Sequence, residues 1–163
     1  MKKIIPTKLS HIIEIPKIED EGFLCFMEEG NQIPFKIKRI YYIHDAFDYA
    51  IRGKHAHKKN KQILFCIKGS ITIKLDNGNE KEFIKLSESN KGIYLDTMMW
   101  HEMLDFNKDT VLLVLASEKF DENDYIRNYQ VFLEKRNGLS HRIKLIFSRF
   151  YWQDFAIRLK NLL

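Results

Sequence analysis

The chain has 163 residues, 45% of them hydrophobic and 30% charged, with only 7 glycines and 3 prolines. This length and composition predict one ordered globular domain with a substantial core, and they exclude a disordered or collagen-like chain. The formal net charge of +5 is concentrated in one segment, because residues 136–163 carry six Lys or Arg and one Asp. Residues 1–135 carry 21 basic and 21 acidic side chains. A neutral domain with a basic tail argues against nucleic-acid binding.

The two cysteines, Cys25 and Cys66, lie in apolar segments and lack the CxxC spacing of redox or zinc motifs. This placement predicts buried free thiols in a reducing compartment. The sequence opens on no secretory signal pattern, and no apolar run reaches membrane-spanning length. We therefore expect a cytoplasmic protein.

Short apolar segments follow one another along residues 1–135, separated by turn signals such as Asn77-Gly78. An Asn-Gly pair tolerates the positive φ angles that a tight hairpin requires. The segments predict strands at 9–15, 22–28, 35–43, 53–57, 62–68, 70–75, 82–85, 92–95, 99–104 and 110–117. Many short strands at this spacing predict an all-β sandwich or barrel.

The pattern changes near Arg136. After Ser140, a suitable helix N-cap, large apolar residues recur at roughly helical spacing with basic residues between them: Ile143, Phe147, Phe150, Phe155, Leu159 and Leu162. We therefore divide the chain into a β domain, 1–135, and a basic amphipathic helical tail, 136–163. We favour a tail that packs on the β domain or across a dimer interface. The alternative is contact with a membrane surface or a partner, which Trp152 would suit.

Two histidines, His55 and His57, stand two residues apart just before a strongly apolar segment. On a strand, side chains at i and i+2 point to the same face, so both imidazoles would project into one space. Imidazole titrates near neutral pH, and a pair of them can therefore move protons or hold a metal ion.

The spacing from His55 through Gln62 to Gly69 is similar to the first motif of the cupin superfamily. Metal-binding cupins have Glu at the position of Gln62, and a neutral amide compensates a cation poorly. His101 is the candidate for the histidine of the second motif, although the usual proline and second glycine before it are missing. We therefore expect no metal at this site.

Longer segments resemble the dTDP-sugar 3,4-ketoisomerases, the WxcM-like, metal-free cupins. They are RIYYIHD (39–45), RGKHAHKKNKQILFCIKGS (52–70), YLDTMMWHEMLDF (94–106) and VLASEKFDENDYIRNY (114–129), which together cover most of residues 35–130. The resemblance implies a cupin jelly roll, a homodimer that exchanges N-terminal strands, and no cofactor. It also implies a reaction: the keto group of dTDP-4-keto-6-deoxyglucose moves from C4 to C3. The product would serve the synthesis of a 3-amino-3,6-dideoxyhexose of a surface polysaccharide.

The same resemblance assigns the site residues. His55 is the base that carries a proton from C3 to C4, and His57 moves a proton between the two oxygens. The resemblance also puts a tyrosine at the hexose. Neighbouring residues of a strand face opposite sides, so only one of Tyr41 and Tyr42 can line the barrel, and we choose Tyr42. Arg39 and Arg52 are the candidates for the diphosphate, because a guanidinium binds phosphate in a bidentate way. Gln62, His101 and Trp100 complete the set of substrate-binding residues, with Trp100 either stacked on thymine or part of the core.

Two other functions remain open. The RGxH element around His55 also resembles the dTDP-4-keto sugar 3,5-epimerases, in which that histidine is the carbon base. A non-catalytic cupin that binds a sugar or a metal is the third hypothesis. The product formed from dTDP-4-keto-6-deoxyglucose distinguishes these three hypotheses, since only a ketoisomerase moves the ketone to C3.

Overall fold

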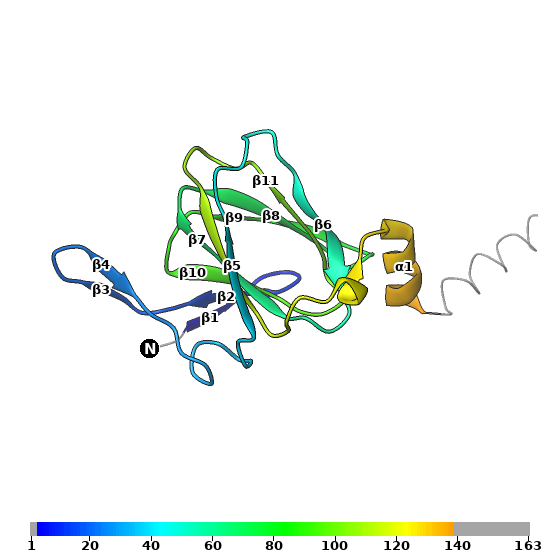
Figure 1. Ribbon diagram of the computed structural model, residues 1–163, viewed down its shortest axis with the longest axis horizontal. Coiled ribbons are helices and arrows are strands. Elements are labelled where there is room, and N and C mark those ends of the chain that lie inside the picture. The colour runs from blue at the N-terminus through cyan, green and yellow to red at the C-terminus, as the bar shows by residue number, and fades with distance from the viewer. Residues whose placement is uncertain (1–2, 139–163) are drawn as a thin grey trace, which may run out of the picture.

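The structure, a computed structural model, describes residues 3–138, and nearly all of the regular structure in this range is β (Figure 1). The strands are, in chain order, β1 (Lys3–Pro6), β2 (His11–Glu14), β3 (Lys17–Glu19), β4 (Phe23–Cys25), β5 (Arg39–Ile43), β6 (Arg52–His57), β7 (Gln62–Lys68), β8 (Ile71–Asp76), β9 (Lys81–Leu86), β10 (Lys91–Leu95), β11 (Trp100–Leu104), β12 (Val111–Ala116) and β13 (Tyr125–Ile126). A short 3-10 helix, η1 (Glu122–Asp124), precedes β13, and the helix α1 (Tyr129–Asn137) follows it.

Two antiparallel sheets form the body of the molecule. One has the strand order β1-β2-β10-β7-β12-β5, and the other has the order β13-β6-β11-β8-β9. Strands distant in sequence are neighbours in both sheets, as in a jelly roll. The predicted all-β cupin jelly roll is therefore confirmed. Within the described residues no helix has the length and hydropathy that crossing a membrane requires.

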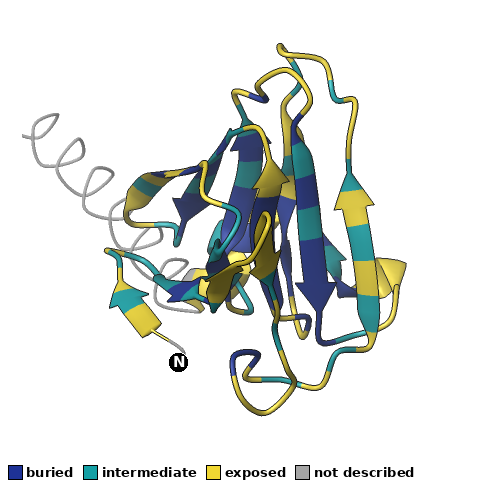
Figure 2. Cartoon of the chain, turned by 90° about the vertical axis from the view of Figure 1, so that its left-hand side faces the viewer, coloured by how far each residue is buried: buried dark blue, intermediate teal, exposed yellow. Residues whose placement is uncertain are grey.

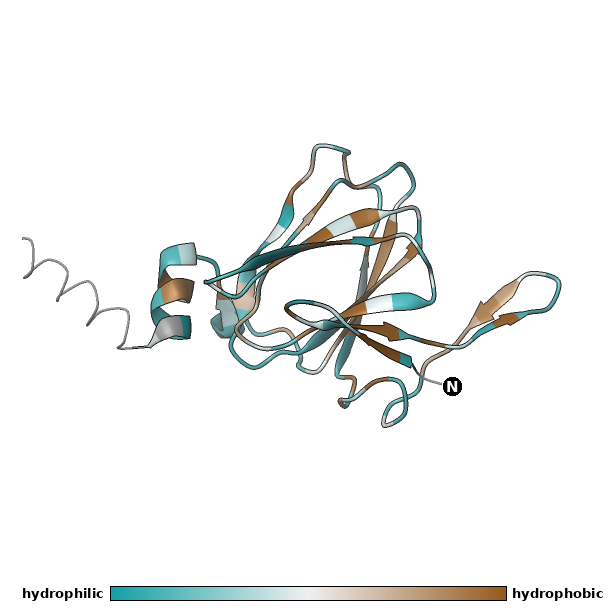
Figure 3. Ribbon diagram, turned by 180° about the vertical axis from the view of Figure 1, so that it is seen from behind, coloured by the Kyte–Doolittle hydropathy of each residue, from teal (hydrophilic) through white to brown (hydrophobic). Residues whose placement is uncertain are grey.

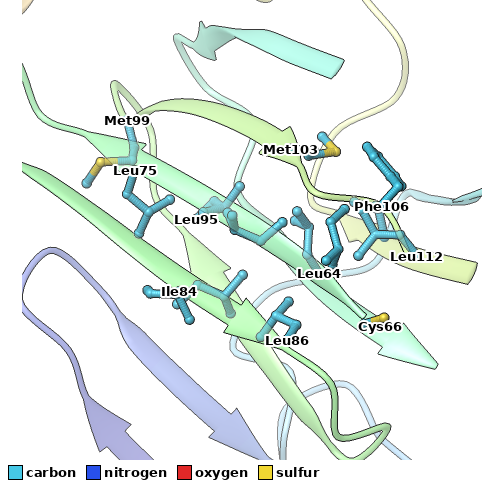
Figure 4. Packing of buried hydrophobic residues seen from close by; sticks show 14 residues of the cluster. Leu64, Cys66, Leu75, Ile84, Leu86, Leu95, Met99, Met103, Phe106 and Leu112 are labelled. Carbon is cyan, nitrogen blue, oxygen red and sulfur yellow. The ribbon is translucent and has the colours of Figure 1, made fainter. Parts of the chain in front are cut away.

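The main core lies between the two sheets and is formed by alternate residues of facing strands. Leu64 of β7, Leu75 of β8 and Leu112 of β12 are fully buried there, and Met103 of β11 belongs to the same cluster (Figure 4). The burial colours of Figure 2 follow this alternation along the central strands. Close packing leaves the strands of this core little freedom. The core therefore holds in place the polar side chains that β6 and β11 carry.

The structure adds elements that the sequence patterns do not predict. These elements are the short strands β1, β3 and β13 and the helix α1. The helix crosses the predicted domain boundary at residue 135 and ends at Asn137, where Gly138 caps it with a φ of 59°. The strand predicted at 35–43 begins at Arg39, because Phe35 and Ile37 instead cover a second cluster on the outer face of the first sheet. The helix predicted after Ser140 lies outside the described residues, so the tail and the division at residue 135 stay predictions.

The β3–β4 hairpin projects away from the barrel (Figure 1), and its hydrophobic residues stand out in Figure 3. Phe23 and Leu24 are 65% and 59% exposed, and the hairpin pairs with no other strand among the described residues. Apolar side chains on a two-stranded arm gain little stability from their own chain.

Candidate active site

A β-bulge in β6 places the two histidines. His101 of β11 lies opposite His55, whereas the next residue, Glu102, lies opposite Gly53, so Lys54 is an extra residue in β6. Gly53 and Lys54 both have positive φ angles, 81° and 54°, and a glycine in this region is typical of one common type of bulge. A Cβ on Gly53 would lie 2.8 Å from the carbonyl oxygen of His101, so only glycine fits there without a shift of the backbone.

Beyond the bulge the strand alternates regularly. His55 and His57 point into the barrel, while Ala56 between them packs on the other face against Trp100 and Phe132. The prediction that the two imidazoles share one space is therefore confirmed. Their Nε2 atoms lie 3.2 Å apart, and the rings meet edge to face with centroids 4.8 Å apart.

Asp124 fixes the protonation of this pair. Its Oδ2 lies 2.7 Å from Nδ1 of His57, and both side chains are buried. The carboxylate also accepts hydrogen bonds from the backbone N–H groups of Lys59 and Asn60, at 2.7 and 3.3 Å. An ionised carboxylate only accepts, so Nδ1 of His57 carries a proton and its Nε2 offers a lone pair. Nε2 of His57 therefore accepts the hydrogen bond from Nε2–H of His55.

His101 completes a cluster of three imidazoles. It is fully buried beneath His55, with ring centroids 4.5 Å apart, and nitrogen atoms of the three rings lie within 4.8 Å of one another. Three histidines are a familiar metal-ligand set, but no carboxylate among the described residues joins them as a fourth ligand, since Asp124 lies behind His57. The expected absence of a metal rests on this missing charge and stays a prediction.

Burial keeps all three imidazoles neutral. It lowers the pKa of His55 to about 4, with a smaller contribution in the same direction from His57. The pKa of His57 is also lowered by burial, although Asp124 opposes the shift. For His101, burial and the two neighbouring imidazoles lower the pKa well below its usual value. A neutral imidazole is the form that accepts a proton, so the cluster is ready to act as a base at neutral pH.

These shifts predict a loss of stability in mild acid. Histidines of the unfolded chain titrate near 6.5, so between that pH and about 4 the unfolded state binds more protons than the folded state. The free energy of unfolding therefore falls as the pH falls, by up to about 1.4 kcal/mol per pH unit for each such histidine. Urea denaturation at pH 7 and pH 5 measures the difference, which we expect to be about 2 kcal/mol or more.

Two variants test the origin of this acid sensitivity. His101→Gln should reduce the difference between pH 7 and pH 5, because it removes one of the buried neutral imidazoles. His44→Gln is the control, since His44 is exposed and is not one of the three clustered histidines, and it should leave the difference unchanged. Equal stability of the unmodified protein at the two pH values would contradict the account.

A cavity of about 610 Å³ opens beside the histidines, between β5 and β6. The side chains that bear on its chemistry are Arg39, Tyr41, Arg52, His55, Tyr125 and Arg127. Tyr125 packs against both catalytic candidates, with its ring centroid 4.9 Å from that of His55 and 4.4 Å from that of His57. The volume lies within the range of small-molecule sites, and the lining combines a base with three guanidinium groups.

The choice of Tyr42 as the tyrosine of the cavity is wrong. Tyr42 is 65% exposed on the outer face of β5, where its ring lies beside His44. Tyr41 lines the cavity instead, and its hydroxyl oxygen accepts a hydrogen bond from Nε2 of Gln62 at 3.1 Å. Burial raises the pKa of Tyr41 to about 12, so the hydroxyl keeps its proton and can donate it toward the cavity.

This correction predicts unequal effects of two similar variants. Tyr41→Phe removes a hydroxyl that faces the cavity, and we expect the turnover of the substrate proposed below to fall roughly 10- to 100-fold. Tyr42→Phe removes an exposed hydroxyl on the opposite face, and turnover should be unchanged. Steady-state kinetics of both variants checks the expectation, and the reverse order of effects would restore Tyr42 to the site.

The other predicted site residues lie at the cavity, behind the histidines, or outside the site. Arg39 and Arg52 line the cavity, as expected for groups that meet a ligand. Gln62 is buried behind the histidines, with Nε2 3.3 Å from Nε2 of His57. Trp100 lies outside this cavity, 5% exposed on the other face of its sheet, where its Nε1–H donates to Glu102. The alternative that assigned Trp100 to the core agrees with this burial.

Three residues of the site were not predicted: Asp124, Tyr125 and Arg127. They belong to the segment 114–129, which carries part of the family resemblance but for which no residue role was predicted. The contact between His57 and Asp124 joins residues 67 positions apart, which no local pattern reveals. The local sequence could have predicted only the short helix η1, because Asp121 is a suitable N-cap and its side chain accepts a hydrogen bond from the N–H of Asn123.

The fold and this site define a class, the cupin-like sugar isomerases and epimerases. The family described as WxcM-like, C-terminal (FdtA) matches residues 8–137, and the chain belongs to this family. The chain is 48% identical over 122 residues to TDP-4-oxo-6-deoxy-alpha-D-glucose-3,4-oxoisomerase of Aneurinibacillus thermoaerophilus, which covers 74% of this chain and 88% of that protein.

Solved structures agree with this assignment. The sugar 3,4-ketoisomerase QdtA of Thermoanaerobacterium thermosaccharolyticum, crystallised in complex with TDP, superimposes with a TM-score of 0.76 and 42% identity, covering 77% of this chain and 93% of that one. A 3,4-ketoisomerase of Helicobacter canadensis gives a TM-score of 0.76 and 41% identity, covering 78% and 96%. The family that the sequence motifs suggested is therefore confirmed.

Proposed function

We propose that this chain is an isomerase that moves the keto group of dTDP-4-keto-6-deoxy-D-glucose from C4 to C3. The observation that carries the proposal is the buried, neutral pair His55 and His57, hydrogen-bonded at 3.2 Å beside a cavity of about 610 Å³. The relatives named above are 3,4-ketoisomerases or an oxoisomerase, and the name of the Aneurinibacillus protein specifies TDP-4-oxo-6-deoxyglucose, so their identity to this chain supports the same reaction.

The reaction requires two proton movements. A base must remove the hydrogen from C3, and a proton must return to C4, while another proton passes between the two oxygens of an enediol or enediolate. A hydrogen next to a ketone is only weakly acidic, so a base within reach and a stabilised oxyanion are both needed. His55 lines the cavity, which supports its role as the carbon base. The hydroxyl of Tyr41 is a donor for the developing oxyanion.

His57 acts on the oxygens in this proposal, in concert with His55. Its Nδ1–H is held by Asp124, and its Nε2 shares a hydrogen bond with His55. A proton received by one imidazole can thus be passed to the other without leaving the site. The reaction is an isomerisation, so the overall oxidation state of the sugar does not change and no redox partner is needed. We therefore propose that the enzyme works without a cofactor.

One experiment tests the reaction and its alternatives. The purified protein is treated with a chelator and mixed with dTDP-4-keto-6-deoxyglucose in deuterium oxide, and the sugar is followed by NMR. A ketone at C3 with deuterium at C4 is the expected result. Deuterium at C3 and C5 with the ketone still at C4 would mean a 3,5-epimerase. Absence of turnover, or turnover that the chelator abolishes, would overturn the proposal.

We propose that two copies of the chain form a homodimer by exchanging the β3–β4 hairpin. Its exposed Ile18, Phe23 and Leu24 would be buried against the second copy, where exchange of an identical element costs little. A double substitution, Phe23→Asp with Leu24→Asp, should convert the dimer to a monomer in size-exclusion chromatography with light scattering. Phe83→Asp, an equally exposed phenylalanine on β9, is the control and should remain dimeric. A dimer in the doubly substituted protein would exclude the hairpin.

The remaining parts of the proposal concern its setting. A 3-keto sugar is a substrate for amino transfer, so the product would be used to make a 3-amino-3,6-dideoxyhexose of a surface polysaccharide. Such nucleotide sugars are made in the cytoplasm, which is the location we propose for this enzyme. Detection of the amino sugar after addition of a sugar transaminase with its amino donor would support this place in the reaction sequence.

A further inference from the structure

Gln62, the first residue of β7, lies behind the cavity and joins two of the groups that the proposed reaction uses. The residue is only 1% exposed and does not line the cavity itself. Its side-chain nitrogen Nε2 lies 3.1 Å from the hydroxyl oxygen of Tyr41 and 3.3 Å from Nε2 of His57. One amide group therefore bridges the tyrosine of the cavity and the histidine pair.

The hydrogen bonds of His57 decide which end of this amide faces the ring. The carboxylate of Asp124 holds a proton on Nδ1 of His57, so Nε2 of that ring has only a lone pair to offer. An amide oxygen 3.3 Å from this lone pair would place two acceptors against each other, whereas an NH₂ group donates to it. His57 thus fixes the NH₂ end of Gln62 toward itself, and the second N–H of that group is directed at Tyr41.

This orientation determines where the hydroxyl proton of Tyr41 points. A phenol oxygen that accepts from an amide N–H directs its own proton elsewhere, and Tyr41 lines the cavity. As that proton is shared with a substrate oxyanion, negative charge moves onto the tyrosine oxygen, where the N–H of Gln62 stabilises it. The guanidinium of Arg39, 5.1 Å from the ring centroid of Tyr41, acts in the same sense. Burial raises the pKa of Tyr41 to about 12, and Arg39 and Gln62 both oppose that shift.

We infer that Gln62 is a positioning residue, which directs the hydroxyl proton of Tyr41 into the cavity and joins this donor to the histidine pair. This role rests on the proposed function, in which Tyr41 donates to the developing oxyanion. Gln62 itself touches no substrate and transfers no proton. Its effect depends on its being a donor, because an ionised carboxylate of the same shape only accepts and would draw the hydroxyl proton away from the cavity.

Two substitutions of Gln62 test this role by steady-state kinetics. Gln62→Met keeps the length of the side chain and removes both N–H donors, so we expect kcat to fall roughly tenfold with KM changed by less than about threefold. Gln62→Glu replaces the donor by an acceptor, and kcat should fall further, by roughly 100-fold or more. In a Tyr41→Phe background no hydroxyl remains to be directed, so Gln62→Met should lower kcat by less than about threefold.

The matched control is Gln32→Glu, the same change at another buried glutamine. Gln32 is 2% exposed, its side chain accepts a hydrogen bond from the backbone N–H of Glu28, and it does not line the cavity. This variant should keep kcat and KM. Thermal unfolding of each variant shows whether a lower rate reflects a lower folded fraction.

A further readout needs no turnover. In the ligand-free protein the side-chain NH₂ protons of Gln62 should exchange slowly with water and give NMR cross-peaks to the rings of both Tyr41 and His57. Absence of the cross-peaks to Tyr41, or equal losses from Gln62→Met with and without the tyrosine hydroxyl, would overturn the inference. Cross-peaks to both rings in a protein that does not turn over the keto sugar would support the orientation inferred for Gln62 and refute the isomerase assignment instead.

Discussion

His55→Asn is expected to lower kcat by roughly 1,000-fold or more while changing the Kd for dTDP by less than about twofold. In the proposed reaction the imidazole acts on the carbon–hydrogen bond in the transition state, whereas the predicted partners of the diphosphate are Arg39 and Arg52 of the cavity lining. Asparagine has a similar size and can hydrogen-bond to His57, but it cannot accept a proton at neutral pH. Turnover by NMR and dTDP binding by calorimetry measure the two effects on one sample.

The matched control is His44→Asn, the same chemical change at an exposed histidine that does not line the cavity beside His55. It should leave turnover and binding unchanged. Thermal unfolding of both variants shows whether loss of activity reflects loss of fold, since His55 is buried and His44 is not. Full activity of His55→Asn would remove this residue from the chemistry, and equal losses of turnover and dTDP affinity would make it a binding residue instead.

What the sequence predicted well depends on local periodicity. The strand period of two placed His55 and His57 on one face, and the structure agrees because both residues follow the bulge in β6. The apolar run from Gln62 to Lys68 became the central strand β7, which is paired on both sides. The reaction was predicted from the resemblance to a known family, because no pattern of apolar or charged residues indicates which bond of a substrate is changed.

What the sequence missed depends on contacts between distant segments. Alternation requires Tyr41 and Tyr42 to face opposite sides, but it does not say which side is the barrel; pairing of β5 with β12 decides that. α1 escaped prediction because it is short, and only Phe132 among the apolar residues of its middle turn is fully buried. The position of Asp124 beside His57 arises because the chain returns to β6 at this point, where β13 pairs with Ala56 and His57. No local pattern in the sequence indicates this pairing.

The second large effect is expected for Asp124→Asn. We treat Asp124 as a positioning residue, because it touches His57 and not the cavity. An amide NH₂ in place of the carboxylate would donate to Nδ1 of His57 and move the imidazole proton to Nε2, where it would face the N–H of His55. The wrong tautomer can no longer relay a proton, as when the carboxylate that orients a catalytic histidine is changed to an amide. We expect kcat to fall roughly 100- to 1,000-fold with little change in KM.

Two readouts distinguish positioning from a purely structural effect. Nitrogen-15 NMR of the imidazoles should show His57 protonated at Nδ1 in the unmodified protein and at Nε2 in Asp124→Asn, and the pH profile of kcat should change with it. Asp121→Asn makes the same change three residues earlier, at the cap of η1, where the side chain bonds Asn123 and not a histidine. This control should keep the tautomer, the pH profile and the rate. A slow Asp124→Asn enzyme with an unaltered His57 tautomer would show that the carboxylate supports the 58–60 loop rather than the proton relay.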